Sequence, residues 1–523
     1  MTKFNISGLK GALGRGPITA ETIPSGRTHE GGAGYAHDDK SELFLLAVAN
    51  FVGEDTFYES GDDRDNRYNA LIRRVAVDDP EWTARFLRWL RTSANMRSAS
   101  LTGGLEAASA LRDAGIPGGR PIVDSVLQRA DEPGEALAYW TAVHGRAVPK
   151  PVKRGIADAA ARLYNERSLL KYDTAGHAFR FGDVLDLTHP APAAGRTWQG
   201  DLFAYALDRR HGRETAPPAS LPTVLANGDL RRRAAREPAA LLDRDALARA
   251  GMTWEDALSL AGAGVDKKRL WEAMIPSMGY MALLRNLRNF DEAGVGDDVA
   301  ERICARFTDP GEMARSRQFP YRFLAAYEQA PSLRWGPALD RALQLSLSNL
   351  PAIRGRSLIL VDTSGSMSAT GFSGRSTMSP VKAAAVFGVA LAARGERVDL
   401  HGFADGVFRH DVRRAASVIR EVDRFVRRVG EVGHGTRIAA AIGATFQAHD
   451  RVFVFSDMQT FAGGEVTRSV PREVPIYGFN LGGYRRTAFD AGTPNRLEFG
   501  GLTDATFRMI PLIEAGRRAA WPF

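Results

Sequence analysis

Two aspartates and three hydroxyl-bearing residues lie where short apolar segments end, and their side chains are of the kind that binds a hard metal ion. The segment LILVDTSGSMS places Asp362, Ser364 and Ser366 directly after an apolar run. A second apolar run, RVFVFSD, ends at Asp457, and Thr436 lies between the two in GHGTRI. Carboxylate and hydroxyl oxygens without a thiolate are the donors that Mg²⁺ prefers, and Mn²⁺ and Ca²⁺ accept them too. The sequence therefore predicts a divalent-cation site, with a coordination position open to water or to an acidic group of a partner.

The alternative interpretation of DTSGSMS is a polar turn that caps the helix after it. Taken alone, the stretch fits a turn and a cation site about equally well. Oxygen donors at matching positions, Thr436 and Asp457, favour the cation site.

The segments that carry these residues are typical of an α/β domain. Short apolar runs (SLILVD, RVDLHGFAD, RVFVFSD and VPIYGFNLG) alternate with helical stretches (SPVKAAAVFGVALAARG, AASVIREVDRFVRRV, TRIAAAIGATFQAHD and LIEAGRRAA). Nearly continuous apolar strands between helices predict a mostly parallel sheet covered on both faces. In such a doubly wound sheet, ligands bind at the carboxyl ends of the strands, where the aspartates are expected.

The part of the chain from about residue 40 to 350 has a different pattern, in which apolar residues recur at the spacing of helices. Examples are SELFLLAVANFVG, NRYNALIRRVAVDD, PEWTARFLRWLRTSA, GIADAAARLYNE, KRLWEAMI and MALLRNLRNF. Short turns separate them, and strand-like alternation is nearly absent. We expect a stack of helix pairs of the α-solenoid type, although no strict sequence period is visible. The two patterns meet at SLSNLPAIRGRS.

Composition restricts the class of protein. With 523 residues, 44% hydrophobic and 25% charged, the chain is expected to be globular and to have more than one domain. The one cysteine, Cys304, excludes an internal disulfide and a thiolate-rich metal site, and fits the reducing cytoplasm. We expect no signal peptide and no membrane span. The net charge is +8, but residues 1–350 hold 46 Lys and Arg against 45 Asp and Glu, so a nucleic-acid surface there requires clustering.

The donor set resembles the metal-ion-dependent adhesion site of von Willebrand factor A domains. The matching residues are the DTSGS segment at 362–366, the loop threonine Thr436 and the strand-end Asp457. The resemblance implies that these residues hold the cation. Arg437 departs from the pattern, because many such domains carry an acidic or amide residue after the threonine, and it makes the rim more basic.

Blocks of the helical part resemble the TROVE module of the Ro autoantigen family and its bacterial relatives. They are RTHEGGAGYAHDDKSELFLLAVANFVGEDTFYE, KRGIADAAARLYNE, FGDVLDLTHPAP and LWEAMIPSMGYMALLRNL. The resemblance implies an N-terminal extension over 1–26, a ring of HEAT-type helical repeats over 27–352 and a von Willebrand A domain over 353–523. It further implies a monomer that binds single-stranded or misfolded RNA ends in the ring and Y-like RNA on its outer surface. An exoribonuclease partner and a role in RNA quality control, maturation or decay also follow.

Clustered cations are the residues expected to contact RNA phosphates, with a strongly salt-dependent affinity. The clusters are Arg146, Lys150, Lys153 and Arg154; Lys171, His177 and Arg180; Lys267, Lys268 and Arg269; and Arg285 and Arg288, which the spacing places with Asn289 on one helical face. Tyr172, Phe179 and Phe181 are candidate stacking partners for bases. The alternative for each cluster is a solvated helix face, and for DLRRRAARE, with Arg231, Arg232, Arg233 and Arg236, we favour that alternative. Phe181 stands where relatives carry a pore histidine, with His177 four residues earlier.

The sequence gives no support for catalysis, and we expect no enzyme. It lacks a legible Ser/His/Asp or Cys/His arrangement and a phosphate-binding GxxxxGK[ST] loop. A metal-dependent nuclease is a weak alternative, because two carboxylates with hydroxyls make a poor two-metal site. A second alternative is a protein-interaction scaffold in which the cation captures an acidic residue of a partner.

Overall fold

The computed structural model describes residues 16–49, 54–213, 215–316, 318, 320–330, 332–347, 353–369, 371, 378–413, 416–500, 510 and 520–523. The chain divides into two compact units. One comprises Met1–Leu71, Arg317–Ala325 and Leu339–Phe523, and the other comprises Ile72–Ser316 and Ala326–Ala338.

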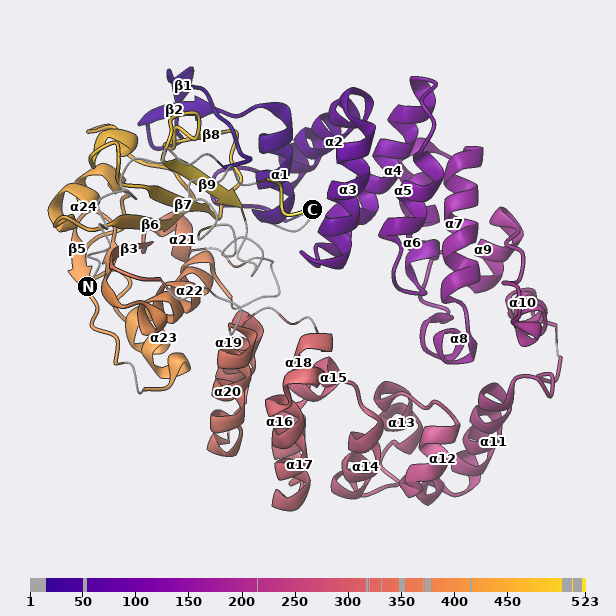
Figure 1. The fold of residues 1–523 in the computed structure, drawn as a ribbon. Helices are drawn as coiled ribbons and strands as arrows, with labels where there is room; N and C mark the ends of the chain where they lie inside the picture. Colours follow the sequence, from indigo (N-terminus) through magenta and orange to yellow (C-terminus); the bar gives the residue numbers. More distant parts are fainter. Residues whose placement is uncertain are drawn as a thin grey trace, which may run out of the picture. The chain divides into compact units, whose positions relative to one another are not determined.

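The second unit is a succession of helices in the part that the structure describes, as predicted (Figure 1). After α2 (Gly61–Asp78), which begins in the first unit, they are α3 (Pro80–Thr92), α4 (Arg97–Asp113), α5 (Gly119–Val126), α6 (Glu132–His144), α7 (Lys150–Leu163), α8 (Glu166–Tyr172), α9 (Phe181–Thr188), α10 (Thr197–Arg210), α11 (Pro222–Arg236), α12 (Arg244–Arg249), α13 (Trp254–Ala261), α14 (Lys267–Met274), α15 (Tyr280–Arg285), α16 (Leu287–Glu292), α17 (Asp297–Thr308) and α18 (Pro310–Ser316). α19 (Pro320–Gln329) and α20 (Gly336–Ser346) follow, and each has residues in both units.

Local sequence signals explain where several of these helices begin. The Asp79 side chain accepts a hydrogen bond from the Trp82 N–H, and Pro80 occupies the first turn of α3, where its missing N–H costs nothing. Close helix packing depends on small residues: a Cβ on Gly104 would lie 2.6 Å from Val126, and one on Gly155 would lie 2.7 Å from the Arg120 carbonyl. These glycines therefore let α4, α5 and α7 pack against one another.

The first unit contains the predicted α/β sheet, with the strand order β5-β4-β3-β6-β7-β9. Its strands are β3 (Arg356–Asp362), β4 (Arg397–Phe403), β5 (Val407–Arg409), β6 (Arg451–Ser456), β7 (Ile476–Asn480) and β9 (Arg496–Gly500). All neighbours pair in parallel except β4 and β5, a hairpin at the edge. The strand that follows β3 in the chain, β4, pairs with one edge of β3, and the later strand β6 pairs with the other edge. The strand order therefore reverses between β3 and β6. Ligands bind at such a switch point in doubly wound sheets.

Helices lie on both faces of this sheet. Leu358 and Leu360 of β3 belong to the same buried cluster as Ile442 of α24 (Ile438–Thr445). The alternate residue Val361 points the other way, since a Cβ on Gly388 of α22 (Pro380–Arg394) would lie 2.8 Å from it. The short α21 (Gly365–Ser368) follows β3, and α23 (Val418–Val426) packs against α22. Full burial on both faces explains why these strands are apolar without alternation.

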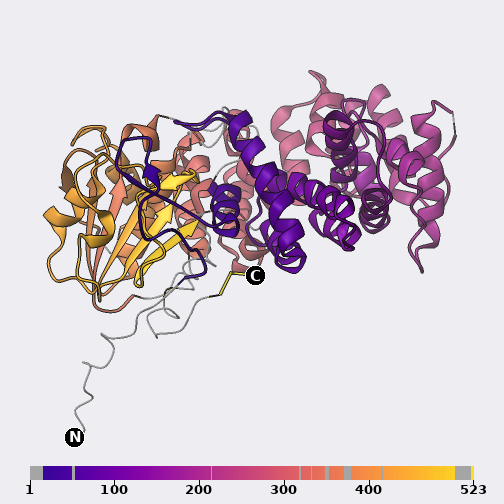
Figure 2. The same cartoon turned by 90° about the horizontal axis from the view of Figure 1, so that it is seen from above.

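The N-terminal segment belongs to the same unit as this sheet. β1 (Gly26–Arg27) and β2 (Ala33–Ala36) form a small sheet with β8 (Arg486–Thr487), and α1 (Asp39–Ala49) packs on β9. Figure 2 shows the indigo N-terminal segment alongside the yellow strands. A buried contact joins them, in which Nε2 of His37 lies 2.7 Å from Oε2 of Glu498.

The predicted domain limits can be compared with the structure only in part. The division at residue 352 follows sequence pattern, whereas the contacts place residues up to 71 with the C-terminal sheet, because β2 pairs with β8. The helix predicted around LIEAGRRAA and the junction SLSNLP lie largely outside the described residues. Within the described part, none of the helices has both the length and the apolar character needed to cross a membrane.

Candidate functional site

Three loops meet at the carboxyl end of the sheet and bring the predicted cation ligands together. The Gly365 N–H donates to the His434 carbonyl at 2.9 Å, which joins the loop after β3 to the loop before α24. The Thr436 carbonyl accepts from the Phe461 N–H at 2.9 Å and from the Thr460 hydroxyl at 3.0 Å, which joins the second loop to the one after β6. The predicted ligands are all buried: Asp362, Ser364, Ser366, Thr436 and Asp457.

The loop after β3 does not use its hydroxyls to cap a helix. Ser364 occupies the N-cap position of α21, yet its side chain makes no capping hydrogen bond. Its hydroxyl lies 3.3 Å from that of Ser366, while its N–H donates to Oδ1 of Asp362 at 2.9 Å. Thr436 likewise does not cap α24, whose N-cap is Arg437. The hydroxyls of Ser364 and Thr436 therefore do not have the capping role that the turn interpretation assigns to them.

Asp457 carries an unsatisfied buried oxygen. Its Oδ1 accepts a hydrogen bond from the Gln459 N–H at 3.1 Å. Its Oδ2 has no hydrogen-bond partner among the described residues, and the residue is only 4% exposed, so water does not replace the missing partner. A buried carboxylate oxygen without a partner costs about 1–3 kcal/mol or more, which a bound cation would offset.

The electrostatics of the two carboxylates also fit a cation. Burial raises the pKa of Asp362 to about 6, although hydrogen bonds from Ser456 and Ser364 oppose the shift. Burial and then the charge of Asp362 raise the pKa of Asp457 to about 7. Two buried carboxylates near each other resist ionisation, and a divalent cation removes that resistance. The described residues contain no group of three or more His, Cys, Asp or Glu side chains able to hold a metal, so the hydroxyls are needed to complete the donor set.

A residue that the sequence analysis did not select fixes the loop before α24. Oδ2 of Asp405 accepts hydrogen bonds from the N–H groups of His434 at 3.1 Å and Gly435 at 3.0 Å. Gly433 has a φ of +90°, and a Cβ there would lie 2.2 Å from the same carboxylate oxygen. Arg437 adds a cation 3.6 Å from Asp405. The sequence did contain a signal for Asp405, because it is the carboxylate that follows the apolar strand in RVDLHGFAD, as Asp362 and Asp457 follow theirs.

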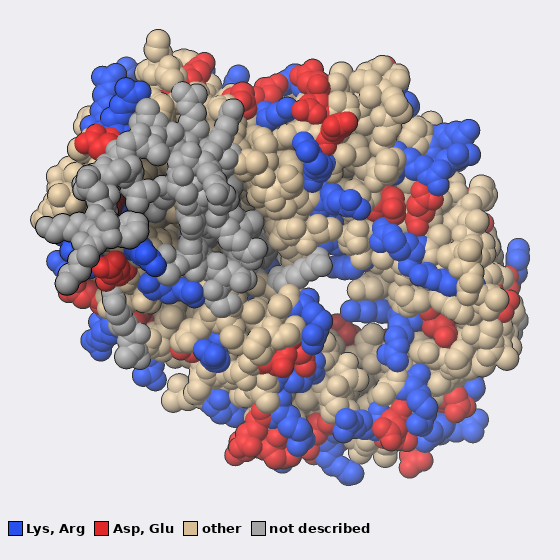
Figure 3. Space-filling view, viewed as in Figure 1, with Lys and Arg blue, Asp and Glu red and all other residues tan. Residues whose placement is uncertain are grey.

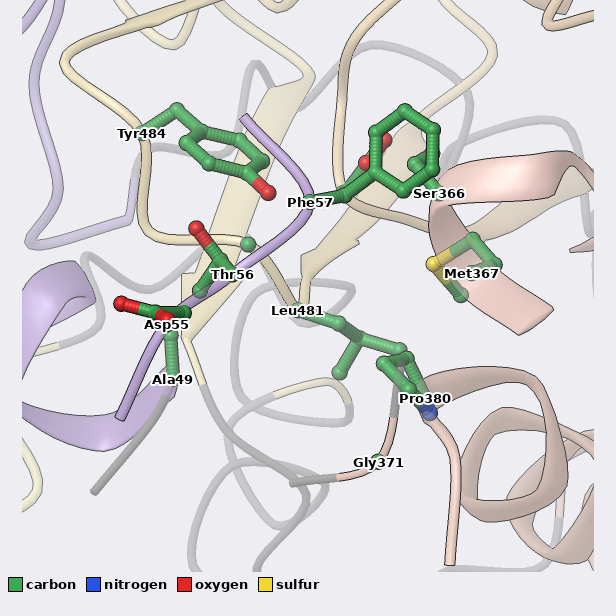
Figure 4. Close-up of a pocket in the computed structure, with 12 residues that line it drawn as sticks. Ala49, Asp55, Thr56, Phe57, Ser366, Met367, Gly371, Pro380, Leu481 and Tyr484 are labelled. Carbon is green, nitrogen blue, oxygen red and sulfur yellow. The ribbon is translucent and has the colours of Figure 1, made fainter. Parts of the chain in front are cut away.

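A small pocket lies against the site. Its volume is about 20 Å³, enough for a water-sized occupant, and its lining includes Ser366 and Asp457. Figure 4 shows the ring of Phe57 beside Ser366, with Thr56 and Tyr484 nearby. The pocket is thus closed in part by a segment of the chain that lies far away in sequence.

The predicted basic cluster at the start of α7 contains cations without partners. Lys150 and Arg154 are exposed and form no ion pair with a described residue. They line a hollow of about 290 Å³ together with Arg112 and Arg120, which pair with Asp113 and Asp158. In Figure 3, Lys and Arg gather over the ends of α5 and α7, whereas over α11 to α17 they alternate with Asp and Glu. Arg146 is exposed and Lys153 is half-buried.

A second cluster without partners occupies the first turn of α14. Lys267, Lys268 and Arg269 are exposed, and none forms an ion pair with a described residue. The Asp266 carboxylate is used as the N-cap and accepts from the Arg269 N–H at 2.8 Å. Cations in the first turn oppose the helix dipole, so they do not stabilise this helix.

The third cluster differs from its prediction at Phe181. This ring is only 3% exposed and stacks on Tyr164 with centroids 3.7 Å apart, so it cannot stack on a base. The prediction that Phe181 is a base-stacking residue is therefore wrong, because the ring is part of the core. Arg180 is tied to Asp173 at 2.7 Å, whereas Lys171 is exposed with its amine 5.1 Å from the Tyr172 ring centre. His177 and Phe179 are half-buried.

The fourth cluster was predicted to lie on one helical face with Asn289, and this prediction is wrong, because Arg285 and Arg288 belong to two different helices. α15 ends at Arg285 and α16 begins at Leu287, because the Asn286 side chain donates to the Ala282 carbonyl and its N–H turns to Leu283 instead. Arg288 pairs with Glu292 at 2.7 Å. In DLRRRAARE, two of the four arginines are paired, Arg231 with Asp256 and Arg232 with Asp229, as expected for an exposed helix.

Comparison with known proteins identifies part of the chain. The TROVE domain family matches residues 243–335, which include the basic first turn of α14. Telomerase protein component 1 of Mus musculus is 37% identical over 83 residues, covering 16% of this chain and 3% of that protein. RNA-binding protein RO60 of Deinococcus radiodurans is 30% identical over 154 residues, covering 26% of this chain and 29% of that protein. The chain thus spans less than a third of the length of either relative.

The fold has a counterpart among solved structures. The crystal structure of the Deinococcus radiodurans RO (RSR) protein superposes with a TM-score of 0.60, covering 91% of this chain and 100% of that one. The two sequences are 19% identical over this match, so the likeness concerns the fold. It agrees with the predicted order of a helical segment followed by an α/β domain.

Proposed function

We propose that the chain binds RNA through its helical unit, because the TROVE domain family matches residues 243–335 and the fold is similar to that of the Deinococcus radiodurans RO (RSR) protein. The observation that carries the proposal is the set of unpaired, exposed cations in the first turns of α7 and α14. Lys and Arg side chains that have no acidic partner are available to neutralise phosphates. A phosphate there would offset the unfavourable position of these cations in the helix dipole.

The form of RNA follows from the family resemblance. We propose that the helical repeats hold single-stranded or misfolded RNA ends, and that an outer basic surface holds a small Y-like RNA. The hollow beside Lys150 and Arg154 supports phosphate binding without base readout, because its charged groups are cations. The role in RNA quality control, maturation or decay, with an exoribonuclease as partner and in the reducing cytoplasm, belongs to the same proposal.

The function of the A-domain site is proposed separately. We propose that Asp362, Ser364, Ser366, Thr436 and Asp457 hold a divalent cation, Mg²⁺ before Mn²⁺ or Ca²⁺. The unpartnered Oδ2 of Asp457 and the oxygen-only donor set support this assignment. When bound, the cation supplies positive charge that joins the three loops. Two carboxylates of this kind give no support for a two-metal nuclease, so the protein is proposed to bind and not to cleave.

Filter binding of an RNA with a single-stranded tail, across a salt series, tests the RNA proposal. Several phosphate contacts predict that the logarithm of the affinity falls linearly with the logarithm of the salt concentration. A flat response, or no binding at low salt, contradicts it. The Asp457→Asn variant in the same assay separates the two sites, because RNA binding by the helical unit is expected to persist while cation binding is lost.

A further inference from the structure

A loop of the N-terminal segment lies along the cation site. The His29 N–H donates to Oε1 of Gln459 at 2.8 Å, and the Gly32 N–H donates to the Thr460 carbonyl at 3.0 Å. The Thr28 hydroxyl donates to the same carbonyl at 2.8 Å. Residues 28–32 therefore run beside residues 459–461, which directly follow the proposed ligand Asp457.

The carboxylate of Glu30 is held within this loop by Tyr58. The Tyr58 hydroxyl donates to Oε1 of Glu30, and burial, this hydrogen bond and the charge of Asp457 raise the pKa of the phenol. Tyr58 in turn packs against Phe57 and Tyr484, which line the pocket beside Ser366 and Asp457. Glu30 is half-buried and forms no ion pair with any described Lys, Arg or His. The negative charge of Glu30 is therefore not neutralised by a neighbouring cation and can act on the cation site.

Aromatic rings fix the position of this pair. The His29 and Tyr58 rings stack with centroids 4.9 Å apart and an angle of 6° between their planes. Tyr484 meets both rings edge-on, at 5.3 Å from His29 and 5.4 Å from Tyr58. Phe57 packs on Tyr58 and lines the pocket beside Ser366 (Figure 4). Such packing limits the freedom of Glu30 to leave the site.

The charge of Glu30 acts on both aspartates. Burial is the largest cause of the raised pKa of each aspartate, the charge of Asp362 comes next for Asp457, and the charge of Glu30 adds a smaller effect to both. The site thus contains two ligand carboxylates and a third carboxylate within electrostatic range. A divalent cation would leave a net negative charge there, which disfavours a further carboxylate from outside.

We propose that Glu30, positioned by Tyr58, is an internal acidic cap beside the cation site, whose charge keeps an acidic residue of a partner away from the open coordination position. The cap rests on the proposed cation site and on a second observation, the buried and unpartnered Oδ2 of Asp457. Glu30 strengthens cation binding by its charge and excludes external carboxylates. Capture of an acidic partner residue, the scaffold alternative, then requires this loop to move away.

Mn²⁺ binding and acetate binding test the cap on the full chain. Free Mn²⁺ is counted by electron paramagnetic resonance, and acetate near the ion is detected by relaxation of its methyl protons. We expect Glu30→Gln to weaken Mn²⁺ binding at least about fivefold and to let acetate approach the bound ion, which the unsubstituted protein prevents. Tyr58→Phe, which releases Glu30, is expected to have the same effects to a smaller degree.

Glu21→Gln is the matched control, because Glu21 is an exposed glutamate of the same segment and is expected to change neither readout. If Glu30→Gln leaves Mn²⁺ affinity and acetate access unchanged while Asp457→Asn loses Mn²⁺, the cap is wrong and the cation site stands. If Asp457→Asn binds Mn²⁺ as well as the unsubstituted protein, the cation site itself is wrong, and the cap with it. Circular dichroism verifies that each variant is folded.

Discussion

The hydroxyl of Ser456 donates a 2.5 Å hydrogen bond to Oδ2 of Asp362, so that the ends of the neighbouring strands β6 and β3 are joined. The same hydroxyl oxygen accepts from the Met458 N–H at 3.0 Å. Because Oδ1 of Asp362 accepts from the Ser364 N–H, both oxygens of this carboxylate have fixed positions. The proposed cation site is thus built into the sheet before any ion binds.

Removing the Ser456 hydroxyl is the first test of this arrangement. Ser456→Ala leaves the buried Oδ2 of Asp362 without its donor and is expected to cost about 1–3 kcal/mol of unfolding free energy. Urea unfolding followed by circular dichroism measures this loss. Ser469→Ala is the control, because that hydroxyl donates to the Glu465 carbonyl at the surface. Equal stability of the two variants would contradict the role of Ser456.

The pKa values of Asp362 and Asp457 predict how the effect of Mg²⁺ depends on pH. Both pKa values are raised, to about 6 and about 7, so the apo protein loses stability as pH rises through this range and the pair ionises. Mg²⁺ binds the ionised pair and is expected to raise the melting temperature more at pH 8 than at pH 5.5. An equal rise at both values contradicts the assignment. Asp457→Asn is expected to show little response to Mg²⁺ at either pH.

The buried contact between His37 and Glu498 predicts that the stability of the protein depends on pH, here because an ion pair forms when His37 is protonated. Burial alone would lower the pKa of His37, but the charge and hydrogen bond of Glu498 raise it overall, with Glu42 and Asp38 adding to the effect. The contribution is complete below pH 6.5 and is lost as pH rises through the raised pKa. His37→Gln is expected to cost about 3–5 kcal/mol at pH 6 and less at pH 9.

Hydrogen exchange of β2 measures the local effect of that substitution. The backbone of Tyr35 and Ala36 pairs with β8, so faster exchange there would show that the N-terminal segment has loosened from the sheet. Exchange in α14, which belongs to the other unit, is the internal reference and is expected to remain unchanged. Unchanged exchange at Tyr35 would contradict a role for His37 in holding the segment.

The stacked pair of Phe181 and Tyr164 predicts a structural role for Phe181. Phe181→Ala is expected to cost about 3–5 kcal/mol, as for other buried aromatic residues. RNA affinity of the folded protein is expected to remain unchanged, because the ring does not reach the surface. Leu187→Ala is the control, since Leu187 lies on the same helix and is 38% exposed. A loss of RNA affinity without a loss of stability would contradict the assignment.

The sheet could be predicted from the sequence because burial on both faces leaves a direct mark on each strand. Strands such as β3 and β6 are continuous apolar runs, and each ends at a carboxylate or near one. The parallel arrangement then places Asp362 and Asp457 at one edge without further information. The helices of the second unit were predictable for a similar reason, the recurrence of apolar residues at helical spacing.

The features that were missed depend on contacts between distant segments. β2 is only four residues long, AGYA, and its partner β8 lies about 450 residues later, so no local pattern predicts the pairing. The local sequence does not predict that Phe181 is buried, because its burial depends on stacking against Tyr164, which lies on another helix boundary 17 residues earlier. The helix break at Asn286 was hidden by apolar spacing that continues on both sides. Glu30 lies in a loop, where periodicity gives no information.

The central claim is that unpaired cations at helix starts bind RNA phosphates, and a triple substitution in α14 tests it most directly. Lys267, Lys268 and Arg269 are replaced by alanine, and RNA affinity is measured by filter binding between low and moderate salt. A triple substitution of the ion-paired surface arginines Arg232, Arg302 and Arg427 is the control. If each α14 cation contacts one phosphate, the slope of log affinity against log salt falls by about 2, at roughly 0.7 per single-stranded contact, and the control leaves it unchanged. An unchanged slope and affinity in the α14 variant would contradict the account.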